Sequence, residues 1–385
     1  MIAVVTWLMS IGVALPMLVL ALECFAGSLA RRERPGAGDA PPFVVLMPAH
    51  DEARGIARSV RSVITQLRAC DQLVVIADNC TDDTAGIARR MGAAVFERHD
   101  PERRGKGYAL EFGRRFIAAN PAQIVIVLDA DCTPAPYALR HLAATAAKRH
   151  AVAQGAYLLV PPPGAPAIVR VSCFAFLVKN LVRQLGLRRL AGVALLQGSG
   201  MAFPYSIFRR IEWNAASLVE DLDLGLRLLC AGEAVVFDDG ARFYSEASSL
   251  QGTGSQRRRW EHGMLQCMLD FAPRLALAAF HGRPHLLFVA STLLVPPTVL
   301  LLAVATAGTA LVLLLSGLSA PLLVLLASWL ALGTGLFAAW SIYGRATLPA
   351  RSLRDVFGYA IWKLPILLQF VTRRERQWVR TEREP

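Results

Sequence analysis

The fold is decided by the stretch Gln123-Ile124-Val125-Ile126-Val127-Leu128-Asp129-Ala130-Asp131, an apolar run that ends in two acids. Residues 42–48 and 72–78 form two more runs of the same kind. Short continuous apolar runs are typical of parallel strands that are buried on both faces of a sheet. Apolar residues at helical spacing over 52–67 and 84–91 separate the runs. The order strand, helix, strand, helix therefore predicts an α/β domain with a doubly wound sheet.

The composition places another part of the chain in lipid. Apolar residues make up 54% of the 385 residues, and the mean hydropathy is +0.41, which is high for a soluble globular protein. Three stretches without charge, 2–22, 286–315 and 322–343, are each long enough to cross a hydrocarbon core of ~30 Å. The second stretch contains Pro296-Pro297, so we expect it to tilt or kink.

Arginines at the ends of the spans set the expected orientation. Arg31, Arg32 and Arg34 follow the first span, and no basic residue precedes it. The excess of positive charge on the cytoplasmic side places the N-terminus outside and the following domain inside. A cleaved signal peptide is the alternative reading, but Met1-Ile2-Ala3 lacks the positive start that such a peptide needs.

The far end of the chain gives a second test of this orientation. If the second and third spans form a hairpin, the C-terminus is also cytoplasmic, in agreement with a group of arginines after the third span. They are Arg345, Arg351, Arg354, Arg373, Arg374, Arg376, Arg380 and Arg383. The interval 356–371 is apolar but short, and Lys363-Leu364-Pro365 interrupts it, so we expect it to lie in the interface or to re-enter.

These patterns predict a multi-pass protein of the cell inner membrane with a large cytoplasmic domain. The expected parts are an anchor over 1–30, the cytoplasmic domain over 41–283, a hairpin over 286–343, and an interfacial helix with a basic tail over 352–385. The formal charge of +12 gathers beside the apolar segments, which suits anionic membrane lipids and requires no nucleic acid. Seven cysteines without close pairs indicate neither a disulfide framework nor a zinc site.

Acids follow the three predicted strands, at the point where each strand ends. Asp51 and Glu52 follow the first, Asp78 ends the second, and Asp129 and Asp131 end the third. The carboxyl ends of parallel strands meet at one edge of the sheet, where ligands bind. Carboxylates in one crevice favour a hard divalent ion, Mg²⁺ or Mn²⁺, which would in turn hold a diphosphate. For the acids after the second strand, solvated turns and helix caps remain the alternative.

A glycine-flanked cation precedes the next predicted helix, over 108–118. In Arg104-Gly105-Lys106-Gly107, the two glycines let the backbone approach a phosphate or a base closely, and Lys106 would bind it. A plain flexible loop is the alternative.

Together, five motifs resemble glycosyltransferase family 2, in the membrane-integrated branch that contains cellulose, chitin and hyaluronan synthases. They are residues 48–52, 78–83, 129–131, 220–221 and the run Gln256-Arg257-Arg258-Arg259-Trp260, in the family's order and followed by a hairpin. The resemblance extends from about residue 43 to the C-terminus. It implies a GT-A fold with a mixed sheet, a divalent metal ion, and inverting transfer from a UDP-sugar.

The resemblance also implies a role for each donor-side acid. Asp51, Glu52 and Asp78 would hold the uridine, although the acidic pair that is usual after the second strand is reduced here to Asp78 alone. Asp129 would contact the nucleotide and Asp131 the metal, and both are expected close to the metal.

On the acceptor side, the family's base falls on Asp221, with Val219 in place of the usual threonine. Gln256 and Arg259 would cradle the diphosphate, and Trp260 would border the acceptor sugar. Physical chemistry requires the same roles, because an acceptor hydroxyl needs a base within ~3 Å and the leaving diphosphate needs its charge neutralised. The alternatives are a favourable charge at a helix N-terminus for Asp221, and a basic amphipathic helix on the membrane for residues 256–260.

Two more segments fit this interpretation. The small residues of Gln197-Gly198-Ser199-Gly200-Met201 suggest a loop that lines the sugar. The tail over 378–383 resembles the loop that closes over UDP in processive synthases, and a frayed basic tail is its alternative.

The product is less constrained than the donor. We expect sugar transfer to a growing glycan, but three spans are fewer than polymer-translocating synthases have. A lipid or polyprenyl-phosphate acceptor, or a pore completed by a homo-oligomer or export partners, therefore remains open. A non-catalytic nucleotide-sugar-binding scaffold is disfavoured because Asp129, Asp131, Asp221 and Arg259 occur together. The first predicted strand is not followed by G-x-G-x-x-G, which argues against a Rossmann dehydrogenase.

Overall fold

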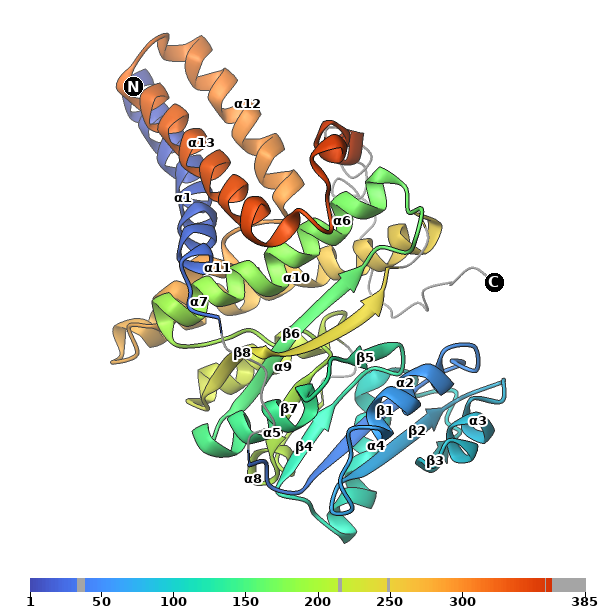
Figure 1. Ribbon diagram of the computed structural model, residues 1–385. Coiled ribbons are helices and arrows are strands. Elements are labelled where there is room, and N and C mark those ends of the chain that lie inside the picture. The colour runs from blue at the N-terminus through green and yellow to red at the C-terminus, as the bar shows by residue number, and fades with distance from the viewer. Residues whose placement is uncertain (33–38, 214–216, 248–249, 357, 362–385) are drawn as a thin grey trace. The chain divides into compact units, whose positions relative to one another are not determined.

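The computed structural model describes residues 1–32, 39–213, 217–247, 250–356 and 358–361, and for 250–259 it describes the backbone alone. These residues belong to two compact units, whose elements are labelled in Figure 1. The sheet unit contains residues 31–160 and 193–247. The helical unit contains residues 1–30, 161–192 and 248–385.

One half of the sheet unit is parallel, as the apolar runs predict. Strands β1 (Phe43–Ala49), β2 (Gln72–Asp78) and β4 (Ile124–Val127) confirm the three predicted strands. A further strand, β3 (Ala94–Arg98), completes the parallel order β3-β2-β1-β4. The sequence did not reveal β3 because it is an edge strand with two of its five residues exposed, so it lacks a continuous apolar run. The helices between these strands are α2 (Ile56–Ile64), α3 (Thr84–Arg90) and α4 (Lys106–Ala119).

The other half makes the sheet mixed. Strand β4 pairs antiparallel with β7 (Met201–Pro204), which pairs antiparallel with β6 (Val152–Val160). Strand β8 (Val235–Glu246) then runs parallel to β6 and antiparallel to the short β5 (Cys132–Pro134), which closes the eight-stranded order. The helices of this half are α5 (Ala138–Arg149), α8 (Tyr205–Phe208) and α9 (Glu220–Ala231).

Close packing of α4 on the parallel strands holds their ends in place. Leu46 and Ile76 are fully buried beneath this helix. A Cβ atom on Gly113 would lie 2.6 Å from Leu46 Cδ1, so only glycine allows the helix to approach this closely. Each fully buried aliphatic side chain contributes about 1.5–3 kcal/mol to stability. The loops that follow β1, β2 and β4 therefore start from fixed positions.

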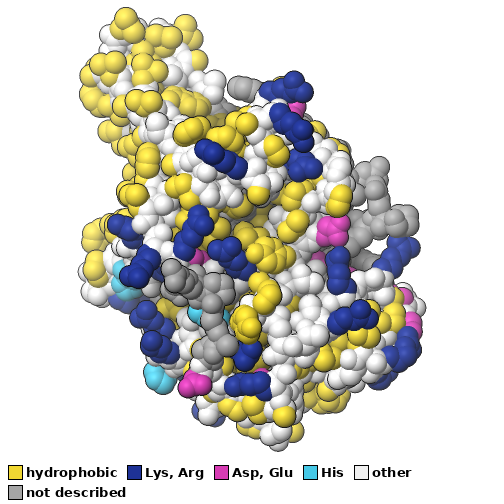
Figure 2. Space-filling model, viewed as in Figure 1, with side chains coloured by type: hydrophobic (Ala, Val, Ile, Leu, Met, Phe, Trp, Pro, Cys, Tyr) yellow, Lys and Arg dark blue, Asp and Glu magenta, His cyan; other side chains and the backbone are white. Residues whose placement is uncertain are grey.

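The helical unit contains three helices long and apolar enough to span a membrane. They are α1 (Ile2–Ser28), α12 (Thr298–Ser316) and the segment Ala320–Gly344, in which α13 (Ala320–Ala339) continues as a π-helix, Trp340–Gly344. Figure 2 shows many hydrophobic side chains on the surface of these helices. The sequence predicted three such segments, and the structure has three among the residues it describes.

The second predicted span, 286–315, is not one helix. It divides into α11 (Leu286–Leu293) and α12, which begins directly after Pro297. Proline lacks the backbone N–H that a helix interior requires, and it disfavours a helical residue before it, so the break falls at Pro296-Pro297. The candidate span is therefore α12 alone.

The remaining helices of this unit are α6 (Ala167–Leu177), a π-helical turn (Val178–Val182), α7 (Arg183–Ala191), α10 (Leu250–Phe280) and a 3₁₀ turn (Ala350–Asp355). The expected cytoplasmic domain, 41–283, thus contributes to both units. The reason is a close approach of α7 to α1: a Cβ on Gly27 would overlap the carbonyl oxygen of Val182, and one on Gly186 would overlap that of Glu23. Small residues at such crossings are typical of membrane helices.

Candidate active site

An ion pair between Lys106 and Asp129 forms the centre of the site in the sheet unit. Asp129 follows β4, and its backbone N–H donates to Ser199 Oγ at 3.1 Å. Lys106 is the first residue of α4, and its Nζ lies 2.5 Å from Asp129 Oδ1. The same ammonium donates to the carbonyl oxygen of Gly198. The end of β4, the start of α4 and the turn over 197–200 therefore meet at one charged group.

Three more carboxylates act on this ion pair. Burial opposes the charge of Lys106, but the negative charges of Asp129, Glu220 and Asp221 outweigh it, so the pKa of Lys106 is raised. Burial also raises the pKa of Asp129, and the charges of Asp131 and Asp221 add to this, while Lys106 opposes it. Three carboxylates thus act on the one ammonium, and a fourth, that of Asp131, acts on Asp129. A site with this excess of negative charge is suited to a divalent cation.

The turn over 197–200 comes close to Asp221 and Lys106 because Gly198 has no side chain. Gly198 has φ +93°, a left-handed conformation that favours glycine. A Cβ there would lie 3.1 Å from Asp221 Oδ2 and 3.7 Å from Lys106 Nζ. The role of this segment in lining the sugar stays a prediction.

A buried glutamine in β6 holds the same turn. The side chain of Gln154 donates from Nε2 to the carbonyl oxygen of Ser199 at 2.9 Å. Its Oε1 accepts from the backbone N–H of Gln197 at 2.8 Å. Gln154 is thus a positioning residue that the sequence patterns did not single out, because it stands in no charged motif, whereas Ser199 belongs to the segment 197–201 that the sequence indicated.

Asp221 lies in the first turn of α9, together with Glu220 and Asp223. Acids at this place are favoured by the partial positive charge of the helix N-terminus. Asp223 forms an ion pair with Arg227 at 2.8 Å, whereas Glu220 and Asp221 act on the charge of Lys106. The helix-terminus interpretation and the site interpretation of this pair are therefore compatible.

The three acids predicted to hold uridine lie after β1 and at the end of β2, where they bond to the protein itself. Asp51 Oδ1 accepts from the backbone N–H of Thr81 at 2.6 Å, and the backbone N–H of Glu52 donates to Thr84 Oγ1 at 2.7 Å. Asp78 is buried and bonds to Arg98 at 2.6 Å. Their side chains and backbones thus tie the first two loops together, and their role toward a base stays a prediction.

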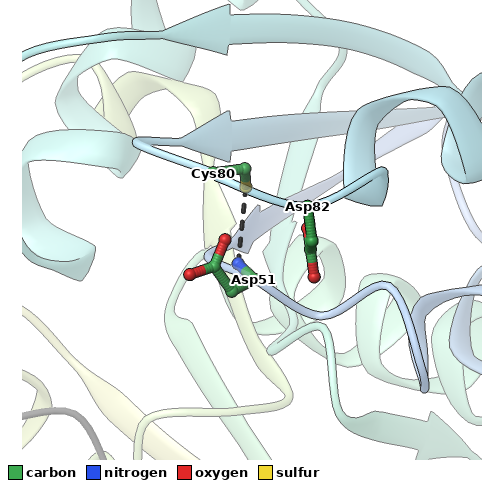
Figure 3. A group of neighbouring side chains, drawn as sticks. All are labelled: Asp51, Cys80 and Asp82. Atoms are coloured by element: carbon green, nitrogen blue, oxygen red, sulfur yellow. Dashed lines mark hydrogen bonds between the residues drawn. The ribbon is translucent and has the colours of Figure 1, made fainter.

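Asp51 also belongs to a small group with Cys80 and Asp82, drawn in Figure 3. One ligand atom from each lies within 4.8 Å of the others. The backbone N–H of Asp51 donates to Cys80 Sγ at 3.4 Å, and Asp82 caps the turn by accepting from the backbone N–H groups of Ala53 and Thr84, both at 3.0 Å. Burial raises the pKa of the Cys80 thiol, so it stays protonated and is a poor ligand for a hard cation. The group therefore joins the loop after β1 to the loop after β2 by hydrogen bonds.

Arg98 is a further residue that the sequence patterns missed. At the end of β3 it is 9% exposed, and it bonds to Asp78, to Asp100 Oδ2 at 3.0 Å and to the carbonyl oxygen of Arg103 at 2.8 Å. Its guanidinium carbon lies 5.6 Å from the ring centroid of Tyr108. Arg98 thereby fixes the loop that leads to Lys106.

The predicted diphosphate and acceptor motif belongs to α10 of the helical unit. Gln256 and Arg259 have side chains outside the described residues. Trp260 is described, and its ring centroid lies 5.7 Å from that of Phe176 in α6. Their predicted roles remain predictions, and so does the closing tail over 378–383, which lies outside the described residues.

Comparison with known proteins defines the family. The family model described as "Glycosyltransferase like family 2" matches residues 41–263. This is more than half of the chain, which therefore belongs to glycosyltransferase family 2. The chain is 24% identical over 253 residues to the probable glycosyltransferase YdaM of Bacillus subtilis, covering 60% of this chain and 57% of YdaM.

The chain is also similar to a second curated relative, over a shorter stretch, and to a solved structure. The low-salt glycan biosynthesis hexosyltransferase Agl6 of Haloferax volcanii is 35% identical over 96 residues, or 24% of this chain and 22% of Agl6. The chain thus spans less than two thirds of either curated relative. The mannosyltransferase PcManGT of Pyrobaculum calidifontis, solved with GDP-Man and Mn²⁺, superposes with a TM-score of 0.59 at 19% identity, covering 93% of this chain and 99% of that one. At this identity the likeness concerns the fold, and it confirms the predicted GT-A-type mixed sheet.

Proposed function

We propose that this chain is an inverting membrane glycosyltransferase that moves a sugar from a UDP-sugar to a growing glycan at the cytoplasmic face of the cell membrane. The observation that carries the proposal is the group of four carboxylates around Lys106, in a family 2 sheet unit. The three candidate spans of the same chain support a membrane location.

The carboxylates fit a divalent cation. Asp129 and Asp131 would hold Mg²⁺ or Mn²⁺, because both carry oxygen ligands and their mutual repulsion contributes to the raised pKa of Asp129. When bound, the ion supplies positive charge to the diphosphate as it leaves. Lys106 already compensates Asp129 and is placed to donate to the same diphosphate.

Asp221 would act as the base on the acceptor. The acceptor hydroxyl gives its proton to this carboxylate while its oxygen attacks the anomeric carbon, and the bond from that carbon to the diphosphate oxygen breaks. The nucleoside diphosphate leaves with the bonding electron pair, and the configuration inverts. Glycine at 198 keeps space open beside Asp221 Oδ2 for a sugar hydroxyl.

A lipid-linked acceptor is the second candidate. It is favoured by large apolar side chains that lie exposed on the helical unit: Leu277 and Phe280 of α10, at 61% and 82%, and Leu287 of α11, at 50%. Exposed apolar side chains on helices of a membrane unit suit the bilayer surface, where a polyprenyl-phosphate acceptor would be presented.

The test uses membranes that contain the full chain, supplied with a panel of UDP-sugars and GDP-sugars and with Mn²⁺. We expect release of UDP with at least one donor, and none from matched membranes that carry Asp221→Asn. Extraction into organic solvent separates a lipid-linked product from a glycan, which is then sized. Donor binding without nucleotide release from any donor would contradict the proposal and favour a scaffold. Release of GDP alone would overturn the UDP assignment.

A further inference from the structure

A groove lies in the sheet unit, between the end of α2 and the start of α5. Its volume is about 520 Å³, within the ~300–1,000 Å³ range of small-molecule sites. Its walls include Ser62, Gln66, Leu67, Pro134, Tyr137 and Arg140, and we call it the α2–α5 groove. Among the described residues, its lining shares no side chain with the site around Lys106.

Two buried polar atoms on residues that line the groove have no hydrogen-bond partner in the described part of the chain. They are Gln66 Oε1 and Arg140 Nε. The amide of Gln66 is fixed, because its Nε2 donates to the carbonyl oxygens of Ser62 at 3.1 Å and Pro134 at 3.3 Å. A buried donor and a buried acceptor that lack partners are costly, so they mark a place where a ligand is expected to supply both kinds of group.

An aromatic ring stands at the edge of the same groove. Tyr137 has φ +65°, a left-handed conformation that is rare for a bulky residue, and its side chain is 48% exposed. The guanidinium carbon of Arg140 lies 5.2 Å from the ring centroid, which holds the ring in this position. With Leu67 and Pro134, the ring offers apolar surface beside the polar atoms. A sugar ring needs this combination, because its C–H face is apolar and its hydroxyls both donate and accept.

The positive charge in the lining of the groove favours an acidic sugar over a neutral one. Arg68 also lines it, but this guanidinium is neutralised by Asp71, at 2.8 Å and 3.0 Å. The groove has no acidic residue among its described lining, so Arg140 supplies an uncompensated positive charge. Arginine and carboxylate pair strongly through charge-assisted hydrogen bonds.

We propose that the α2–α5 groove is a second saccharide site, which binds a sugar residue that carries a carboxylate, such as a hexuronic acid. Strand β5, whose three residues follow Asp131, leads from the site around Lys106 to the groove over about 10 Å. The identity of the bound saccharide as acceptor or product rests on the proposed function.

The test measures binding directly, with the full chain purified in detergent and observed by saturation-transfer NMR. The probes are sodium glucuronate and glucose at millimolar concentration. We expect signal transfer to glucuronate, weaker transfer to glucose, and at least a tenfold loss of glucuronate affinity in Arg140→Met and in Gln66→Leu. Arg149→Met, which removes an exposed arginine from the last turn of α5, is the matched control and should bind normally. Thermal unfolding of each variant shows whether it is folded.

The absence of glucuronate binding in the wild-type chain, or equal binding by Arg140→Met, would overturn the proposal. Equal binding of glucose and glucuronate would overturn its acidic specificity. Nucleotide release measured on the same preparations separates the two hypotheses. If nucleotide is released but glucuronate does not bind, only the groove proposal is wrong. If glucuronate binds through Arg140 but no nucleotide is released, only the transferase proposal is wrong.

Discussion

The ammonium of Lys106 lies 2.5 Å from the carboxylate of Asp129, so the acid that would face a metal-bound diphosphate already has a counterion within the protein. The same ammonium donates to the carbonyl oxygen of Gly198 and lowers the repulsion among the surrounding acids. A cation at this position can keep the site ordered before the donor arrives. It can then donate to the diphosphate without a large rearrangement.

Replacement of Lys106 by Met should weaken donor binding. A hydrogen bond to a charged group contributes about 1.5–3 kcal/mol, which corresponds to a ~10- to 150-fold rise in the donor Kd or KM. Lys148→Met, which removes an exposed lysine near the end of α5, is the control and should leave donor affinity unchanged. The measurement is titration with UDP in the presence of Mn²⁺. An unaltered Kd in Lys106→Met would remove this residue from the donor site.

Two substitutions distinguish the candidate metal positions. Asp131→Asn should reduce Mn²⁺-dependent turnover by ~100-fold or more, because it removes a ligand of the metal ion that would neutralise the leaving diphosphate. Cys80→Ser should keep both turnover and metal dependence, since its thiol only joins two loops and its pKa is raised by burial. The assay is nucleotide release against Mn²⁺ concentration, with EDTA as the metal-free reference. Full turnover in excess EDTA would contradict the metal assignment.

Asp221→Asn should slow the chemical step and leave donor binding unchanged. Loss of a general base lowers kcat by ~100-fold or more, whereas UDP affinity should change little. Asp223→Asn on the same helix is the control, because that carboxylate binds Arg227 instead. Loss of UDP binding together with turnover would make Asp221 a donor ligand or a structural residue.

The sequence predicted the parts of the site that stand in charged motifs at strand ends. Asp129 and Asp131 fall there, because the carboxyl ends of parallel strands lie at one edge of a sheet, whereas Asp221 stands in the first turn of α9. Lys106 was identified from its two flanking glycines, and the structure places it at the centre. The three apolar runs likewise predicted β1, β2 and β4 almost to the residue.

The supporting residues were not predictable because their contacts are distant in sequence. Gln154 supports the turn at 197–200 from another strand, and no local pattern signals such a bond. Arg98 ends a half-exposed edge strand, so periodicity gave no reason to examine it. The grouping of residues 161–192 with the candidate membrane helices also depends on distant contacts, because Gly27 and Gly186 allow close contact between helices far apart in the chain.

A buried ion pair in the helical unit allows a test of stability. Glu23 of α1 is 2% exposed and lies 2.5 Å from Arg183 Nε, while Thr292 donates to its other oxygen, also at 2.5 Å. Glu23→Gln leaves the arginine buried without its counterion and should destabilise the chain by about 3–5 kcal/mol, whereas the double change to Met at both positions should recover much of this. Glu97→Gln in an exposed pair is the control, with at most ~1 kcal/mol. The readout is thermal unfolding in detergent. A double variant no more stable than Glu23→Gln would contradict this account.

The orientation in the membrane follows from the three candidate spans and the arginines beside them. Arg31 and Arg32 follow α1, and Arg345 and Arg351 follow the third span, so both places should lie on the cytoplasmic side, where nucleotide-sugars are made. A tag inserted at Gly164 and another after Pro385 should then resist protease added to intact cells. Tags before Met1 and at Gly317, between α12 and α13, should be cleaved. Permeabilised cells, in which all four tags should be cut, show that each is accessible in principle. Cleavage of the Gly164 tag in intact cells would place the loop that follows β6 of the sheet unit outside, and the proposed use of a cytoplasmic donor would then be wrong.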